Sequence, residues 1–308
     1  MERIGEVLRN GAYTWKQNPI LCAPFVLDTF VRFLFFMIVL AGLAVVIGID
    51  LFMSLGSGIS EIMQALQNTG ESSIEAAEAM VKVYQLAVPF TGVFIVALII
   101  LMIGSALIRT FFEVGAVGMA KNATLTGATR MNDLFWYGRR STVSLFLANI
   151  VIALIFLAGI VFLVPGILLL ASSGSGGMAM AAFAIGIILW IGYALILSIG
   201  LAPVTYALVI DNTSPIEGIE KGWRFFSGHK LDVFLMWLVV IAIFMSLGMI
   251  GQVFYMNPVA AVIWQFVATL INICILLPLI TVWWTRLYLD RETLAAGIPA
   301  QAPAPAQV

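Results

Sequence analysis

The sequence predicts an all-α integral membrane protein with six transmembrane helices. Of its 308 residues, 62% are hydrophobic and 10% are charged, and the mean hydropathy is +1.08. Apolar runs of roughly 18 or more residues are long enough to cross a ~30 Å hydrocarbon core as helices. Their lack of strict alternation argues against a barrel. We expect spans near Phe30–Phe52, Val88–Ile108, Val143–Ala171, Met178–Tyr206, Val233–Phe254 and Ala260–Tyr288.

Lysine and arginine gather on one side of these spans. They lie in or beside the N-terminal segment, residues 109–142, residues 202–232 and the C-terminal end, whereas only Lys82 lies in a loop on the other side. Because basic loops stay in the cytoplasm, we expect both termini to be cytoplasmic in a multi-pass protein of the cell (plasma) membrane. The outer loop, residues 53–86, then carries four acids: Glu61, Glu71, Glu75 and Glu78.

Several classes of protein find no support. The net charge is -1 and no basic patch stands apart from a membrane end, so we expect no nucleic-acid partner. Cys22 and Cys274 fall at different membrane depths, which predicts free thiols. His229 is the single histidine, and no zinc-helix, serine-elbow or P-loop pattern occurs. We therefore expect no enzyme and no cofactor.

A densely charged segment, DNTSPIEGIEKGWRFFSGHKLDVF at residues 211–234, lies between two long apolar runs. Thr213 or Ser214 suits a helix N-cap, and Pro215 suits the first helical position. Ser227 and Gly228 would end this helix. The segment thus predicts one short helix before a span.

Apolar and charged side chains lie on different faces of this helix. Spacings of three, four and three residues place the bulky apolar residues on one face: Ile216, Ile219, Trp223 and Phe226. The charged residues form pairs at the i,i+4 spacing: Glu217 with Lys221, and Glu220 with Arg224. This amphipathic pattern predicts either a helix lying along the cytoplasmic membrane surface or a connector packed on the other helices.

The charged segment has a weaker copy ninety positions earlier. The aligned pairs are Asn122 with Asn212, Phe135 with Phe225, Gly138 with Gly228, Arg140 with Lys230, Val143 with Val233 and Leu145 with Leu235. The N-terminal segment, with Trp15 and Lys16 before the first span, is a third and looser copy. We therefore expect three units of one amphipathic segment plus two spans, about 1–108, 109–206 and 207–290, in a membrane domain 1–294. The Pro/Ala-rich residues 295–308 predict a disordered tail.

This layout, with SPIEGIEKGWRFFSGHKLDVF leading into a span, resembles the membrane domain that precedes some bacterial glycerophosphodiester phosphodiesterases and related uncharacterised prokaryotic membrane families. The resemblance covers about residues 1–290 and implies a multi-span membrane domain. The chain ends at Val308, which leaves no room for the soluble phosphodiesterase barrel. We therefore expect none of that activity.

Two sets of residues are candidates for function. The first set comprises basic and aromatic residues at the predicted cytoplasmic ends, suited to lipid headgroups or a partner: Trp15, Lys16, Arg139, Arg140, Lys221, Trp223, Arg224 and Lys230. The second set comprises polar residues within the spans, where such groups are rare: Asp28, Arg32, Asn149, Gln265 and Asn272. Asp28 and Arg32 can pair within one helix or contact a ligand. The three amides can bond across helices or line a polar cavity.

These features favour a non-enzymatic scaffold or accessory protein whose partners are membrane lipids or another membrane protein. The repeated amphipathic segments and the scarcity of buried charge support this hypothesis. The alternative is a transporter, channel or lipid-translocating protein, favoured by the mid-span amides and by Pro165, Pro203 and Pro278, which can kink helices. An intramembrane enzyme is a third hypothesis, but no residue pair suggests an acid and a base.

Overall fold

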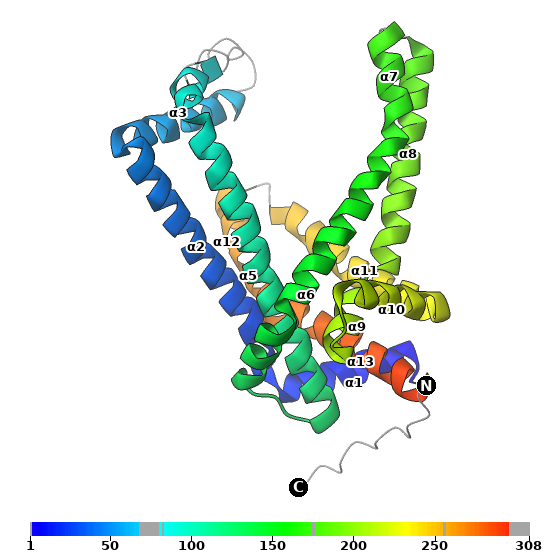
Figure 1. Ribbon diagram of the computed structural model, residues 1–308. Helices are drawn as coiled ribbons and strands as arrows, with labels where there is room; N and C mark the ends of the chain where they lie inside the picture. Colours follow the sequence, from blue (N-terminus) through cyan, green and yellow to red (C-terminus); the bar gives the residue numbers. More distant parts are fainter. Residues whose placement is uncertain (1, 68–79, 82, 174–175, 255–256, 296–308) are drawn as a thin grey trace. The chain divides into compact units, whose positions relative to one another are not determined.

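The described chain is helical (Figure 1). The computed structural model describes residues 2–67, 80–81, 83–173, 176–254 and 257–295, and no strand occurs in these ranges. Six helical stretches within them are long and apolar enough to cross a membrane: Pro19–Ile47, Val83–Thr126, Met131–Ala171, Gly177–Asp211, Lys230–Phe254 and Pro258–Glu292. Each overlaps one predicted span, so the prediction of six apolar helices is confirmed.

The chain forms two compact units, one of Asp28–Arg109 and a larger one of Met1–Leu27 with Thr110–Val308. The smaller unit holds most of α2, all of α3 and the first half of α5. The bounds are α2 Ala23–Ile47, α3 Ile49–Gln67, the 3-10 turn η2 Val88–Phe90 and α5 Thr91–Thr126. Within this unit α2 and α5 run side by side, and the ring of Phe35 fills the space left by the missing side chain of Gly104.

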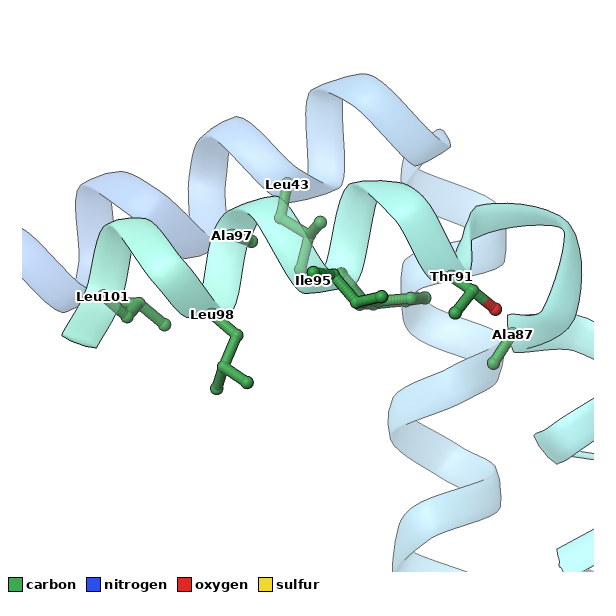
Figure 2. Close-up of a pocket in the computed structure, with 8 residues that line it drawn as sticks. Leu43, Ala87, Thr91, Ile95, Ala97, Leu98 and Leu101 are labelled. Atoms are coloured by element: carbon green, nitrogen blue, oxygen red, sulfur yellow. The ribbon is translucent and has the colours of Figure 1, made fainter. Parts of the chain in front are cut away.

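An apolar groove follows α2 and α5 within the smaller unit. It has a volume of about 450 Å³ and is lined by Leu43, Ala87, Thr91, Phe94, Ile95, Ala97, Leu98 and Leu101. Figure 2 shows Leu43 reaching it from α2 while most of the other side chains come from α5. Thr91 is the polar side chain in this lining, and its hydroxyl donates to the Val88 carbonyl oxygen at 2.8 Å. Because that hydroxyl is already bonded, the groove offers an apolar surface of the kind that faces lipid tails.

The predicted C-terminal end of the first span is wrong. We expected the helix to continue to Phe52, but α2 ends at Ile47 and Gly48 has φ 89°. Glycine adopts this left-handed conformation without the steric cost of a Cβ. Helix α3 then begins at Ile49, so the predicted outer loop starts as a helix, with Glu61 exposed on it. Three other acids and most of the predicted tail lie outside the described residues: Glu71, Glu75, Glu78 and residues 296–308.

Most of the connection at residues 109–142 continues the long helices on either side of it. Helix α5 continues to Thr126, and α6 begins at Met131 after a short turn in which Gly127 has φ 79°. We expect an amphipathic segment here between two separate spans, whereas both long helices continue into it. Small residues allow α5 and α6 to pack closely here: Leu134 lies against Gly115, Tyr137 against Gly118 and Phe111 against Gly138.

The larger unit packs its helices around a core near one end of the spans. Its further elements are α1 Ile4–Gln17, η1 Pro19–Cys22, α6 Met131–Ala158, η3 Gly159–Leu163, α7 Val164–Ser173, α8 Gly177–Gly200, α9 Val204–Asp211, α10 Pro215–Gly228, α11 Lys230–Phe254, α12 Pro258–Ile271, the π-helical turn η4 Asn272–Leu276 and α13 Leu277–Ala295. Helix α13 packs against α1 and α9. Its Trp283, Trp284 and Tyr288 are buried in this core.

A helix forms in the charged segment, but its buried face differs from the predicted stripe. Helix α10 has Ser214 at the N-cap and Pro215 in its first turn, as expected. Gly218, Gly222 and Phe225 are buried, whereas Ile216 is 74% exposed. The two glycines allow the side chains of α9 to approach the α10 backbone closely. A pattern of bulky apolar residues does not reveal a buried face that is formed partly by glycines. Helix α10 packs on α9, α6 and α8, as the connector interpretation predicts.

The structure does not confirm the three-unit arrangement. Gly228 ends α10, and α11 begins at Lys230, so the amphipathic helix and the span are separate elements. The aligned Gly138 lies inside α6, which continues unbroken. The repeat therefore stays a prediction from the sequence.

Proline positions coincide with interruptions of the helices. Pro165 follows the 3-10 turn η3, Pro203 precedes α9, and Pro278 follows the π-helical turn η4. A proline removes a backbone donor and clashes with the preceding turn, so changes in helical pitch at these places are expected.

Candidate functional site

The candidate cations of α10 are neutralised by acids. The Lys221 ammonium lies 3.6 Å from Asp211 and 3.5 Å from Glu217, and Arg224 donates to Glu220 at 2.6 Å. Both predicted i,i+4 pairs are therefore confirmed. Trp223 packs against Gly200 and keeps part of its ring exposed. Their acid partners leave Lys221 and Arg224 poorly suited to bind a further anion.

The remaining candidates at the predicted cytoplasmic ends lie on other helices. Lys16 is exposed in the last turn of α1, and Lys230 is exposed at the start of α11. Trp15 is half-buried, and its indole Nε1 is a buried donor without a partner among the described residues. The structure does not gather these three with α10 into one pocket among those that it describes.

Arg139 and Arg140 line an open pocket on the first turns of α6. This α6 pocket, defined by Asn132, Phe135, Trp136, Arg139 and Arg140, has a volume of about 450 Å³. The Arg140 guanidinium lies over the Trp136 ring, 5.0 Å from its centroid, in a cation–π contact. The contact orients the arginine beside the pocket.

The opposite face of α6 explains why these side chains point outward. Leu134, Gly138 and Ser141 are buried, and Phe111 of α5 packs against Gly138. In a helix of 3.6 residues per turn, Phe135, Trp136, Arg139 and Arg140 lie on the side of α6 away from these positions. Phe135 and Trp136 are accordingly 43% and 51% exposed.

The arginines of the α6 pocket lack an acid partner in the part of the chain that the structure describes. Among the described residues, neither Arg139 nor Arg140 forms an ion pair with an acid. The nearest acid along the helix, Asp133, accepts hydrogen bonds from the Thr129 hydroxyl at 3.0 Å and the Arg130 backbone N–H at 2.9 Å. It is thus engaged in capping α6. The α6 pocket thus places two exposed guanidinium groups beside aromatic rings.

The polar candidates within the spans are dispersed. In the smaller unit Arg32 donates to Asp28 at 2.5 Å, which confirms their pairing within one helix. In the larger unit Asn149 and Asn272 are half-buried and Gln265 is exposed. The Asn272 side-chain oxygen is buried without a described partner in the π-helical turn η4. A polar cavity lined by the three amides stays a prediction.

The other sequence candidates give no metal site. Cys22 and Cys274 are free thiols, as predicted. Within the described ranges, no group of three or more His, Cys, Asp or Glu side chains could hold a metal ion.

Sequence reasoning missed a network that joins the two ends of the chain. Arg286 donates to the Glu2 carboxylate at 2.8 and 2.7 Å, and Arg291 donates to Asp232 at 2.8 Å and to the Glu2 carbonyl oxygen at 3.0 Å. Arg291 also pairs with Asp290. We call these five residues the terminal ion-pair network. It ties the start of α1 to α13 and α11.

Glu2 makes the stability of this network depend on pH. Hydrogen bonds from Arg286 hold the pKa of Glu2 below its ordinary value. The ion pair therefore contributes fully above the unfolded pKa of about 4.3 and is lost as the pH falls through the lower folded pKa. We expect Glu2→Gln to reduce stability by about 1–2 kcal/mol at pH 7. The difference from the wild type should shrink in thermal melts below about pH 4.

The exposed Glu220 is the matched control for this experiment, because it pairs with Arg224 at the protein surface. Glu220→Gln should change the melting temperature little at any pH, since surface ion pairs contribute little. An equal effect of the two substitutions would contradict the role of the network.

The described residues hold six helices that are long and apolar enough to cross a membrane, as expected of an all-helical polytopic membrane protein. The chain belongs to a family described as a domain of unknown function, DUF7847, whose model matches residues 3–285. It is similar to an uncharacterized protein of Archaeoglobus fulgidus, with 24% identity over 313 residues, covering 97% of this chain and 99% of the other. No solved structure matches the chain. The resemblance to the membrane domain of phosphodiesterases is not confirmed by these matches and stays a prediction.

Proposed function

We propose that the chain is a non-enzymatic protein of the cell membrane that acts as a lipid- or partner-binding scaffold or accessory protein, with both termini in the cytoplasm. The α6 pocket carries this proposal, because its two arginines have no acid partner among the described residues and lie beside exposed aromatic rings. Such a combination suits the headgroup level of a membrane, where aromatic and basic side chains are enriched.

Native mass spectrometry of the protein released from mild detergent tests this function. We expect the wild-type chain to retain either lipids or a stoichiometric protein partner, because the unpaired arginines favour an anionic ligand. A chain that retains neither, even after incubation with added phospholipid, would contradict the proposal.

A second candidate function is transport, including lipid translocation. The π-helical turn η4 favours it, since such turns occur often at functional sites and this one carries the unsatisfied Asn272 oxygen. Solute or lipid flux in reconstituted vesicles that is abolished by Asn272→Leu, but kept in Gln265→Leu, would support this candidate over a scaffold.

A further inference from the structure

The α6 pocket continues into an apolar stripe on the same side of the helix. Val143, Leu147, Ile150 and Leu154 are all exposed and follow one another at spacings of four, three and four residues. Trp136 precedes Val143 by seven residues, and Arg140 precedes Leu147 by seven. Two helical turns separate the members of each pair, so pocket and stripe share one face.

The length of this stripe matches one leaflet of a membrane. From Val143 to Leu154 the helix advances eleven residues, about 16 Å at 1.5 Å per residue. Half of a ~30 Å hydrocarbon core is about 15 Å. A molecule whose anionic group lies at the arginines could therefore extend an acyl chain along the stripe to the middle of the membrane.

We infer that this face of α6 binds one anionic phospholipid, its phosphate held by Arg139 and Arg140 and an acyl chain lying along Val143 to Leu154. The inference rests on the proposed function and names the class of lipid. Charge-assisted hydrogen bonds from guanidinium groups to phosphate oxygens supply the preference for an anion. The apolar stripe favours a lipid over a soluble phosphate, because a soluble phosphate has no acyl chain to contact it.

Helix α10 offers a matched comparison within the same chain. Lys221 and Arg224 also place two cations near a tryptophan, but Asp211, Glu217 and Glu220 neutralise them. Removing these two charges removes as much positive charge as removing Arg139 and Arg140. The two double substitutions therefore separate a specific site from a general effect of net charge.

The test compares the wild type, Arg139→Gln/Arg140→Gln and Lys221→Gln/Arg224→Gln by native mass spectrometry. Each protein is incubated with equimolar phosphatidylglycerol and phosphatidylcholine of identical acyl chains. We expect the wild type to prefer phosphatidylglycerol and the α6 variant to lose about tenfold in affinity for it. The α10 variant should stay within about twofold of the wild type. Thermal melts confirm folding, and single Arg139→Gln replaces the α6 variant, or single Lys221→Gln the α10 variant, where the double variant does not fold.

Each of the other outcomes decides against this lipid site, and some also decide against the proposed function. An unchanged preference in the α6 variant overturns this site while leaving the proposed function intact, whereas a wild type that holds neither lipid nor partner overturns both. Displacement of phosphatidylglycerol by millimolar glycerol 3-phosphate would show a site for a soluble phosphate instead. Loss of a bound protein, rather than a lipid, from the α6 variant would assign the face to an acidic partner.

Discussion

Replacing Arg291 by methionine should lower the free energy of unfolding by roughly 2–4 kcal/mol, the largest loss that we expect from one side chain. The Arg291 side chain is 3% exposed, and its guanidinium pairs with Asp232 and Asp290 and donates to the Glu2 carbonyl oxygen. Methionine fills similar space but leaves both carboxylates without their cation. These acids keep some contact with water, which holds the loss below that of a fully buried charge.

Arg224→Met provides the control, because Arg224 is an exposed member of a pair of the same chemistry. It should change stability by less than about 1 kcal/mol. The measurement is the melting temperature of each purified variant in one detergent, followed by intrinsic tryptophan fluorescence. Equal shifts for the two variants would contradict a structural role for the terminal ion-pair network.

The sequence predicts the spans well, because hydrophobic length is a local property that the membrane thickness fixes. It predicts the helix Pro215–Gly228 and its i,i+4 pairs for the same reason, since both depend on neighbours within one turn. The continuation of α5 and α6 into residues 109–142 was not predicted, because it depends on contacts between the two helices.

The candidate site could be predicted only in part. The i,i+4 acids predicted the pairing of Lys221 and Arg224, but no pattern in the sequence marks Arg139 and Arg140 as lacking an acid partner. Asp211, a further acid partner of Lys221, lies ten residues earlier on a different helix. Glu2 and Arg286 meet across 284 residues, a distance for which no local pattern gives a signal.

The buried face of α10 was also not predicted from the sequence. Its close packing leads to the second large loss of stability that we expect. We expect Gly222→Val to lower the free energy of unfolding by about 1–3 kcal/mol, because a larger side chain overpacks a closed interface. A Cβ at Gly222 would lie 2.6 Å from the Val204 Cγ2 atom and 2.7 Å from the Val204 Cα atom. The second of these is backbone, which cannot rotate away, so α10 must move from α9.

Gly228→Ala is the control for this substitution, since a Cβ there meets nothing within 4 Å and the residue lies in the same helix. It should leave the melting temperature unchanged or raise it, because alanine loses less backbone entropy on folding. Displacement of α10 should also weaken the contact between Lys221 and Asp211, whose partners lie on α10 and α9. Gly222→Val combined with Lys221→Gln should therefore destabilise the protein by less than the sum of the two single effects. Strict additivity would mean that the tight packing at Gly222 does not position the charged face of α10.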